Sequence, residues 1–218
     1  TCLNKARTKE ILTYHKIPTP RFAVVNNLNE LNSADFDLPF PLIVKPSRED
    51  ASAGIEGASI VDSIAALRRR VRYIFQSFDQ PAIVEEYIEG RELNVAIIGN
   101  KRPIVMPISE IDFSGLPAHY PRIVTYNAKW IEGTEEYAGT VGVCPAPLEP
   151  EVERMVKDLA LRSYRVMGCR DYARIDLRLD TKGRPFVLEV NPNPDISDDA
   201  GFARSSRAYG LTFDEMIA

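Results

Sequence analysis

The sequence predicts an α+β protein built from two lobes, and three observations lead to this class. The chain has 218 residues, of which 44% are hydrophobic and 27% are charged, as in an ordinary globular protein. Segments with helical spacing alternate with strand-like segments along the whole chain. Two pairs of strand-like segments are joined by short turns, which predicts antiparallel hairpins. We expect the lobes, residues 1–90 and 91–218, to meet near Glu89–Arg91.

The first lobe is expected to combine two helices with a small sheet. Asn4 is a suitable N-cap for the first helix, and the I-P-T-P segment ends it. The second helix carries apolar residues at helical spacing behind an Asp62/Ser63 cap. A polar stretch rich in small residues predicts a flexible loop at 47–58. The predicted order is a helix at 4–15, strands at 21–25, 40–46 and 59–61, a helix at 62–78 and a strand at 82–90.

The second lobe is expected to contain two hairpins and one long helix. The long helix should end at Gly168, a suitable C′ residue, and the last short helix should open with a Thr212/Glu215 capping box. A loop rich in Gly and Pro is expected at about 111–121. The predicted order is strands at 92–99 and 102–109, a strand at 124–130, a helix at 150–167, strands at 174–180 and 185–191, and two short helices.

Composition and charge exclude several classes of function. The net charge of −4 offers no cationic surplus for nucleic acid, and the apolar runs are far shorter than the roughly 20 residues of a membrane span. Cys2, Cys144 and Cys169 lie far apart, as expected for reduced thiols in a cytoplasmic protein. His15 and His119 have no His or Cys neighbour at ligand spacing, which disfavours a zinc site or a His-dependent nucleophile.

The hairpin at 174–191 is predicted to hold two carboxylates face to face. A two-residue Lys182-Gly183 turn pairs residues whose numbers sum to 365, so Asp176 falls opposite Glu189. By the same register Arg174 falls opposite Asn191. The other face of the hairpin is apolar and comprises Ile175, Leu177 and Leu179 against Leu188 and Val190.

Two facing carboxylates repel unless a cation or a shared proton lies between them. An oxygen-rich Asp, Glu and Asn set suits Mg²⁺ or Mn²⁺, which makes this a predicted metal site. The alternative is that Arg174 and Arg178 neutralise the pair on a solvated sheet face. Lys45 adds a second signal, because it ends an apolar strand just before a loop whose backbone N–H groups suit a polyphosphate.

Six motifs follow one another along the chain. They are N-K-A-R-T-K at 4–9, P-L-I-V-K-P-S-R-E at 41–49, V-E-E-Y-I-E-G-R-E at 84–92, Y-N-A-K-W at 126–130, R-I-D-L-R-L-D at 174–180 and L-E-V-N-P at 188–192. In this order they resemble the ATP-grasp superfamily, and within it the D-alanine:D-alanine ligase type. The resemblance covers essentially the whole chain and implies an ATP-grasp fold, with nucleotide bound between the sheets of two α+β lobes. It also implies that an N-terminal lobe precedes this segment, and it allows a homodimer.

The resemblance implies a role for each matching residue. Lys5 and Lys45 would contact the ATP phosphates under a closing loop that contains Ser52 and Gly54. Strand-edge backbone in the hinge would bind adenine, and Glu92 would accept from the ribose hydroxyls. The hinge residues are Glu85, Glu86, Tyr87 and Ile88.

The remaining matches concern the chemistry. Lys129 would reach the γ-phosphate, and Arg174 would bind the developing oxyanion. For Arg174, a salt bridge to Asp176 or Glu189 is an equally good reading from sequence alone. The Mg²⁺ (or Mn²⁺) ligands would be Asp176, Glu189 and Asn191.

The implied activity is ATP-dependent ligation of a small carboxylate to an amine through an acyl phosphate. The alternatives are a nucleotide-binding regulatory or scaffold domain without turnover and, within the enzymes, a biotin-carboxylase-like member. Three departures from the family pattern predict a substrate other than D-alanine. They are Ala51 in the phosphate loop, Trp130 after the γ-phosphate lysine, and Asp195 where the family has glycine, a carboxylate that suits an amine or guanidinium of the substrate.

Overall fold

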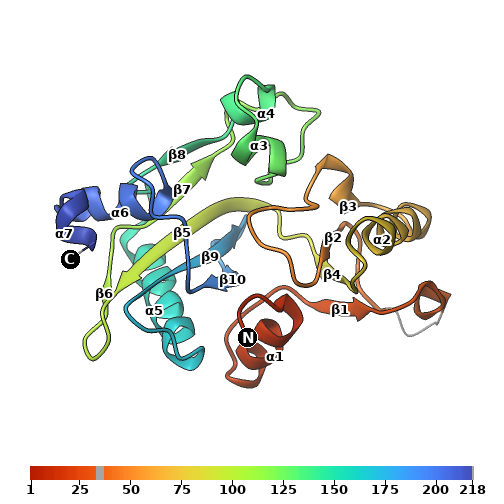
Figure 1. Cartoon of the computed structure of the whole chain (residues 1–218), viewed down its shortest axis with the longest axis horizontal. Helices are drawn as coiled ribbons and strands as arrows, with labels where there is room; N and C mark the ends of the chain where they lie inside the picture. The colour runs from red at the N-terminus through yellow and green to blue at the C-terminus, as the bar shows by residue number, and fades with distance from the viewer. Residues whose placement is uncertain (33–36, 218) are drawn as a thin grey trace.

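The computed structural model describes residues 1–32 and 37–217 and shows two antiparallel sheets side by side (Figure 1). The four-stranded sheet has the order β1-β4-β2-β3. The six-stranded sheet has the order β10-β9-β5-β7-β8, with β6 paired to β5. The first sheet comprises β1 (Phe22–Val25), β2 (Leu42–Pro46), β3 (Ile60–Val61) and β4 (Ala82–Glu86). The second comprises β5 (Gly90–Ile98), β6 (Ile104–Val105), β7 (Ser109–Asp112), β8 (Val141–Val143), β9 (Tyr172–Asp180) and β10 (Pro185–Asn191).

One face of the first sheet is covered by α2 (Ile64–Phe78). The Ser63 hydroxyl accepts from the backbone N–H of Ala66 and so caps the helix, as predicted. The fully buried side chains of Leu67, Val71 and Ile74 pack with the strands into one apolar core. Two 3₁₀ segments, η1 (Leu28–Asn32) and η2 (Gly57–Ser59), complete this part of the chain.

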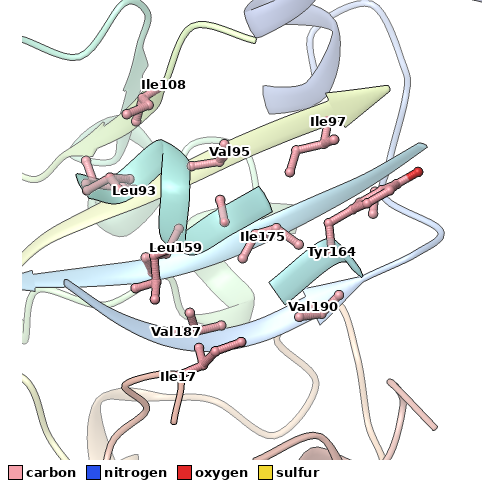
Figure 2. Close-up of a cluster of buried hydrophobic side chains, with 14 of the residues drawn as sticks. Ile17, Leu93, Val95, Ile97, Ile108, Leu159, Tyr164, Ile175, Val187 and Val190 are labelled. Carbon is pink, nitrogen blue, oxygen red and sulfur yellow. The ribbon is translucent and has the colours of Figure 1, made fainter. Parts of the chain in front are cut away.

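The second sheet is covered on both faces. On one face lies α5 (Pro150–Val166), whose Leu159 and Tyr164 pack against Val95 and Ile175 of the central strands (Figure 2). On the other face, α6 (Gly201–Tyr209) and α7 (Phe213–Ile217) bury Phe202 and Met216 in a separate small cluster. The short helices α3 (Tyr126–Trp130) and α4 (Glu135–Ala138) lie near the β7 and β8 end (Figure 1).

The first helix, α1 (Lys5–Tyr14), packs with the second sheet although it precedes the first sheet in the chain. Leu12 and the following Ile17 are buried in the same cluster as α5, β9 and β10, and Figure 2 shows Ile17 beside Val187. The backbone N–H of Val187 also donates to the carbonyl of Pro18 at 2.8 Å. A division of the chain at residue 90 therefore follows the two sheets but not the packing of α1.

The predicted register of the 174–191 hairpin is wrong near its turn. Pro185 pairs with Leu179 and Val187 with Leu177, one residue out of the expected register, until a bulge at Leu188 restores the Glu189 to Asp176 pair. The bulge arises because the turn has three residues, with Gly183 at a φ of +77°, rather than two. As a result Val187, not Leu188, faces the core.

Two other predicted strands differ from the structure. The segment at 124–130 is not a strand, because the Thr125 hydroxyl accepts from the N–H of Ala128 and caps the short helix α3. The strand predicted at 102–109 is reduced to the two residues of β6, because Pro103 and Pro107 have no N–H for a ladder. Within residues 1–32 and 37–217, no helix has both the length and the apolar character required to span a bilayer.

Candidate active site

A cleft of about 840 Å³ lies between the two sheets and brings together residues from both. One wall is formed by β2, β4 and the loop after β2, and the other by β5, β9 and β10. Of the predicted site residues, all but Gly54 line it. These are Lys5, Lys45, Ser52, Glu85, Glu86, Tyr87, Ile88, Glu92, Lys129, Arg174, Asp176, Glu189 and Asn191.

Buried lysines gather around one carboxylate at the β2 and β4 end of the cleft. The Glu85 carboxylate accepts from the Lys45 ammonium at 3.0 Å, and the Lys9 ammonium lies 3.5 Å away. Lys9 is fully buried, and this burial lowers its pKa to about 8. Burial would raise the pKa of Glu85, but the two ammonium groups hold it below its usual value. Lys5 adds a further cation, whose Nζ donates to the carbonyl of Glu49 and lies 3.8 Å from the Glu189 carboxylate.

The loop after β2 is tied to the opposite lobe by α3. The indole N–H of Trp130 donates to the carbonyl of Ala51 at 2.9 Å, and the N–H of Tyr126 donates to the carbonyl of Ile55 at 2.9 Å. Ala51 and Ser52 both adopt a positive φ, which turns the loop over the lysines. Two of the three departures from the family pattern, Ala51 and Trp130, therefore contact each other.

Gly54 has a structural role in this loop and does not line the cleft. Its φ is +69°, and a Cβ atom at this position would lie 2.7 Å from the ring of Phe78 and 2.8 Å from Pro46. Its carbonyl accepts from the buried Arg70 guanidinium at 2.6 Å. Glycine is required here by a close approach to α2, and its carbonyl anchors the loop.

The hinge is only partly free to bind a ligand through its backbone. Because β4 lies between β1 and β2, it is not an edge strand, in contrast to the prediction. The N–H groups of Glu86 and Tyr87 donate to the carbonyls of Arg21 and Pro41, and the carbonyl of Ile88 accepts from a guanidinium. Any backbone recognition of a ligand must therefore use the remaining groups at the end of β4.

Arg178 holds the hinge in place. Its guanidinium is almost fully buried and donates to the carbonyls of Ile88, Gly90 and Arg122, and to the Glu92 carboxylate at 3.0 Å. Burial raises the pKa of Glu92, although the guanidinium opposes this shift. Arg178 thus partners Glu92 rather than neutralising the carboxylate pair.

The predicted carboxylate pair lies on the wall of the cleft formed by the second sheet, where β9 and β10 run side by side. Asp176 lies opposite Glu189 in the register, and Arg174 lies opposite Asn191. The Arg174 guanidinium contacts both oxygens of Asp176, at 2.7 and 2.8 Å, and the Asn94 amide donates to it at 2.8 Å. Burial would raise the pKa of Asp176, but Arg174 holds that pKa below its usual value. The salt bridge considered from sequence is therefore present.

The donor chemistry of this pair fits a hard divalent cation. Asp176, Glu189 and Asn191 present carboxylate and amide oxygens, the ligands that Mg²⁺ prefers. Within the described part of the chain, three or more Asp, Glu, His or Cys side chains do not gather at any candidate metal position. The protein therefore offers two carboxylates and one amide here.

Lys129 lines the cleft at the end of α3, near Asp176 and Glu189. Burial lowers its pKa, and the neighbouring Arg174 guanidinium adds to this shift. Its ammonium lies 5.0 Å from the centre of the Trp130 ring. Lys129 is thus a partly desolvated cation beside the metal-type carboxylates.

Sequence reasoning missed Asn94, Leu188 and Arg204, which line the cleft, and Lys9, which is buried behind it and contacts Glu85. Lys9 was detectable in principle, because it lies four residues after Lys5 and so on one helix face. Asn94 and Arg204 gave no local signal, because their partners are far away in the chain.

A family model described as "D-ala D-ala ligase C-terminus" matches residues 11–218. An uncharacterized protein of Sinorhizobium fredii, y4sG, is 35% identical over 98% of this chain and 60% of its own length. A D-alanine–D-alanine ligase of Cupriavidus necator is 33% identical over 99% of this chain and 62% of its own length. The chain thus spans about three fifths of the length of these relatives.

Solved structures agree with the sequence matches. A D-alanine–D-alanine ligase of Bacillus anthracis, solved in complex with ATP, has a TM-score of 0.77 and 26% identity, and the match covers 99% of this chain and 63% of that one. The VanG D-Ala:D-Ser ligase of Enterococcus faecalis has a TM-score of 0.80 and 26% identity, with 99% and 60% covered.

Proposed function

Because this chain belongs to the D-Ala–D-Ala ligase family, as its C-terminal part, and has the ATP-grasp fold, we propose that it forms an amide bond at the expense of ATP. A carboxylate would attack the γ-phosphorus, giving an acyl phosphate and ADP, and an amine would then displace phosphate. The protein's contribution to such a reaction is positioning and charge neutralisation. The full-length protein is proposed to be a ligase of carbon–nitrogen bonds.

The observation that carries this proposal is the presence of a lysine cluster and a carboxylate pair in one cleft. At the lysine end, Lys9 and Lys45 share the single carboxylate of Glu85, and this surplus of cations suits a polyphosphate. Lys5, 3.8 Å from Glu189, connects the lysines to the pair of Asp176 and Glu189, and Lys129 lies near that pair. A triphosphate that spans the cleft would place its terminal phosphate near Lys129.

Each remaining group has a proposed role in holding the reactants. We assign ribose binding to Glu92 and adenine binding to the hinge, Glu85–Ile88, with Arg178 as the residue that positions both. Ser52 would donate to phosphate from the loop that Trp130 holds closed. Arg174 would bind the developing oxyanion once its contact with Asp176 is shared with a ligand.

Asp176, Glu189 and Asn191 are proposed to hold Mg²⁺ (or Mn²⁺), since their oxygen donors fit that ion. When bound, such an ion supplies charge stabilisation to phosphate oxygens. Arg174 and Asn94 hold the Asp176 carboxylate in one position, and this would fix where the ion binds.

We further propose that the substrate is an amino acid or small carboxylate other than a pair of D-alanines. Asp195 lines the cleft and carries a negative charge, and hydrogen bonds from Ser197 lower its pKa. A site that hydrogen-bonds its substrate discriminates strongly against molecules without the matching group. Changed polar groups on the cleft wall should therefore change the substrate rather than merely slow the reaction.

The proposal is tested by phosphate release from full-length protein with ATP, Mg²⁺ and a pooled set of amino acids, followed by mass spectrometry of the products. We expect release that depends on the pool and is lost in Asp176→Asn. The matched control is Asp158→Asn, on the exposed surface of α5 and outside the cleft. ATP binding without turnover under any pool would instead support a regulatory or scaffold role.

A further inference from the structure

The helix α6 directs a guanidinium into the cleft that none of the roles above uses. Arg204 is half-buried and lines the cleft, while its neighbours Phe202 and Ala203 are buried and anchor the helix to the sheet. The Nε of Arg204 donates to the hydroxyl of Ser109 on β7 at 3.1 Å. The side chain is therefore held across the sheet at a fixed position.

Two glycines provide the space for this guanidinium. A Cβ atom on Gly142 of β8 would lie only 2.1 Å from the Cζ of Arg204. A Cβ atom on Gly201 would lie 3.3 Å from an Nη atom of the same group. The guanidinium thus lies flat against backbone, and its position depends on the absence of these two side chains.

Arg204 has no carboxylate partner among the residues that the structure describes, unlike the other two arginines of the cleft. Arg174 pairs with Asp176 at 2.7 Å, and Arg178 pairs with Glu92 at 3.0 Å. Burial lowers the pKa of Arg204, and the Arg207 and Arg174 guanidinium groups add to this shift, whereas Cys144 and the Asp199 carboxylate oppose it. A partly desolvated cation without a carboxylate in contact is costly, and an anion supplied by a ligand would offset this cost.

The guanidinium of Arg204 lies close to the proposed reaction centre. The position of a Cβ on Gly201 is 3.3 Å from Arg204 and 3.7 Å from the Asn94 side-chain oxygen. The Asn94 amide in turn contacts Asp176 at 2.8 Å. One side chain therefore separates Arg204 from the carboxylate pair.

We propose that Arg204 binds the carboxylate of the acceptor, which is accordingly an amino acid with a free carboxyl group. This inference rests on the proposed ligase function. In such a ligation the acceptor's amine reacts and its carboxylate does not, so the carboxylate is free to be held throughout. Asp195 and Asp199, exposed on the same wall of the cleft, carry the charge that suits the acceptor's ammonium group before it reacts.

The test compares full-length wild type with three variants on acceptors supplied in pairs. Each pair is an amino acid and its carboxamide, given with ATP and Mg²⁺, and phosphate release yields KM and kcat for each. Arg204→Gln removes the charge, and Gly142→Ala keeps the charge but displaces the guanidinium. The matched control, Arg207→Gln, removes an exposed guanidinium of α6 that is paired with Asp198.

We expect wild type to prefer the acid over its amide. Arg204→Gln and Gly142→Ala should raise KM for the acid by about tenfold to a hundredfold and abolish this preference, because a charge-assisted hydrogen bond is lost. The KM for ATP and the melting temperature should change little, and Arg207→Gln should behave as wild type. A merely structural role for Arg204 would lower the melting temperature without changing the preference.

The proposal is overturned if wild type uses amides as well as acids, or if Arg204→Gln retains the preference for acids. Failure of the ligase function gives a different result, ATP binding without turnover on any acceptor. In that case, calorimetric titration of the ATP-bound protein compares the binding of each amino acid with that of its carboxamide. Equal binding of the two, or no binding of either, would overturn the role of Arg204.

Discussion

Replacing Glu85 by Gln should strongly destabilise the protein. Glu85 is 1% exposed and is the only carboxylate that the described ion pairs assign to either Lys9 or Lys45. The substitution preserves size and removes one negative charge. Two buried ammonium groups would then face each other without a counter-charge.

The expected loss of stability in Glu85→Gln is the sum of its effects on Lys45 and on Lys9. The Lys45 ammonium loses a charge-assisted hydrogen bond of 3.0 Å, which costs about 2 kcal/mol. Lys9 has a pKa of about 8 and still carries its proton at neutral pH. Without Glu85 we expect that pKa to fall below neutrality, and the stabilisation then lost is about 1.4 kcal/mol for each pH unit between the working pH and the wild-type pKa of about 8. The total is about 3 kcal/mol at neutral pH.

The pH dependence gives a more specific signature. A lysine whose folded pKa is depressed binds fewer protons in the folded state, so stability rises with pH between the folded and unfolded pKa values. In wild type this rise for Lys9 begins near pH 8, whereas in Glu85→Gln it begins below neutrality. The loss of stability should therefore be larger at about pH 6.5 than at about pH 8.5, by at least roughly 1 kcal/mol.

Urea unfolding of wild type, Glu85→Gln and the exposed control Glu89→Gln at both pH values measures these differences. We expect Glu89→Gln to lie within about 0.5 kcal/mol of wild type. An equal loss at both pH values, or a loss below about 1 kcal/mol for Glu85→Gln, would contradict the assignment of Lys9 as a charged and buried partner.

Three further predictions concern the ligand. Asp176→Asn and Glu189→Gln should weaken Mg²⁺-dependent ATP binding and preserve the fold; equal Mg-ATP affinities by calorimetry would contradict this. Glu189→Gln removes an ion pair of 3.8 Å with Lys5 and also removes one of two facing carboxylates, so it should change the metal-free melting temperature little. Glu92→Ala should weaken ATP binding by about 1–2 kcal/mol and affect the binding of free triphosphate less. It should also lower the stability of the protein, because the buried Arg178 guanidinium loses its carboxylate partner. Unchanged affinity for ATP would refute the ribose role of Glu92. Full-length protein with ATP, Mg²⁺ and D-alanine should give little dipeptide by mass spectrometry, whereas rapid D-alanyl-D-alanine formation would refute the substrate proposal.

The elements that could be predicted from the sequence are those with a local cause. The cap at Ser63, the stop at Gly168 and the Thr212/Glu215 box each depend on residues within one turn, and the structure confirms them. The facing of Asp176 and Glu189 was also predicted, because a short turn fixes the register over a few residues.

The errors occur where a distant contact decides the local structure. The turn at 181–183 has one residue more than expected, and a bulge at Leu188 compensates for it, so the carboxylates still face each other while Val187 enters the core. The segment around Thr125 has β-favouring residues but is capped as a helix, and its neighbour Trp130 bonds to the loop at Ala51. Neither partner is visible in a local pattern.

The surplus of positive charge in the cleft lowers the stability of the fold and suits the proposed binding of a polyphosphate. Lys9 contacts no solvent and so no ligand, yet it keeps Glu85 ionised and oriented toward Lys45. Lys9 and Lys45 share this one carboxylate, whereas Lys5 lies 3.8 Å from Glu189, so the lysine end retains a surplus of positive charge. A protein could remove the surplus by one more carboxylate, and folding alone would favour that change. We attribute this surplus positive charge to a bound polyanion that would neutralise it, in the same way that an acceptor carboxylate would neutralise Arg204.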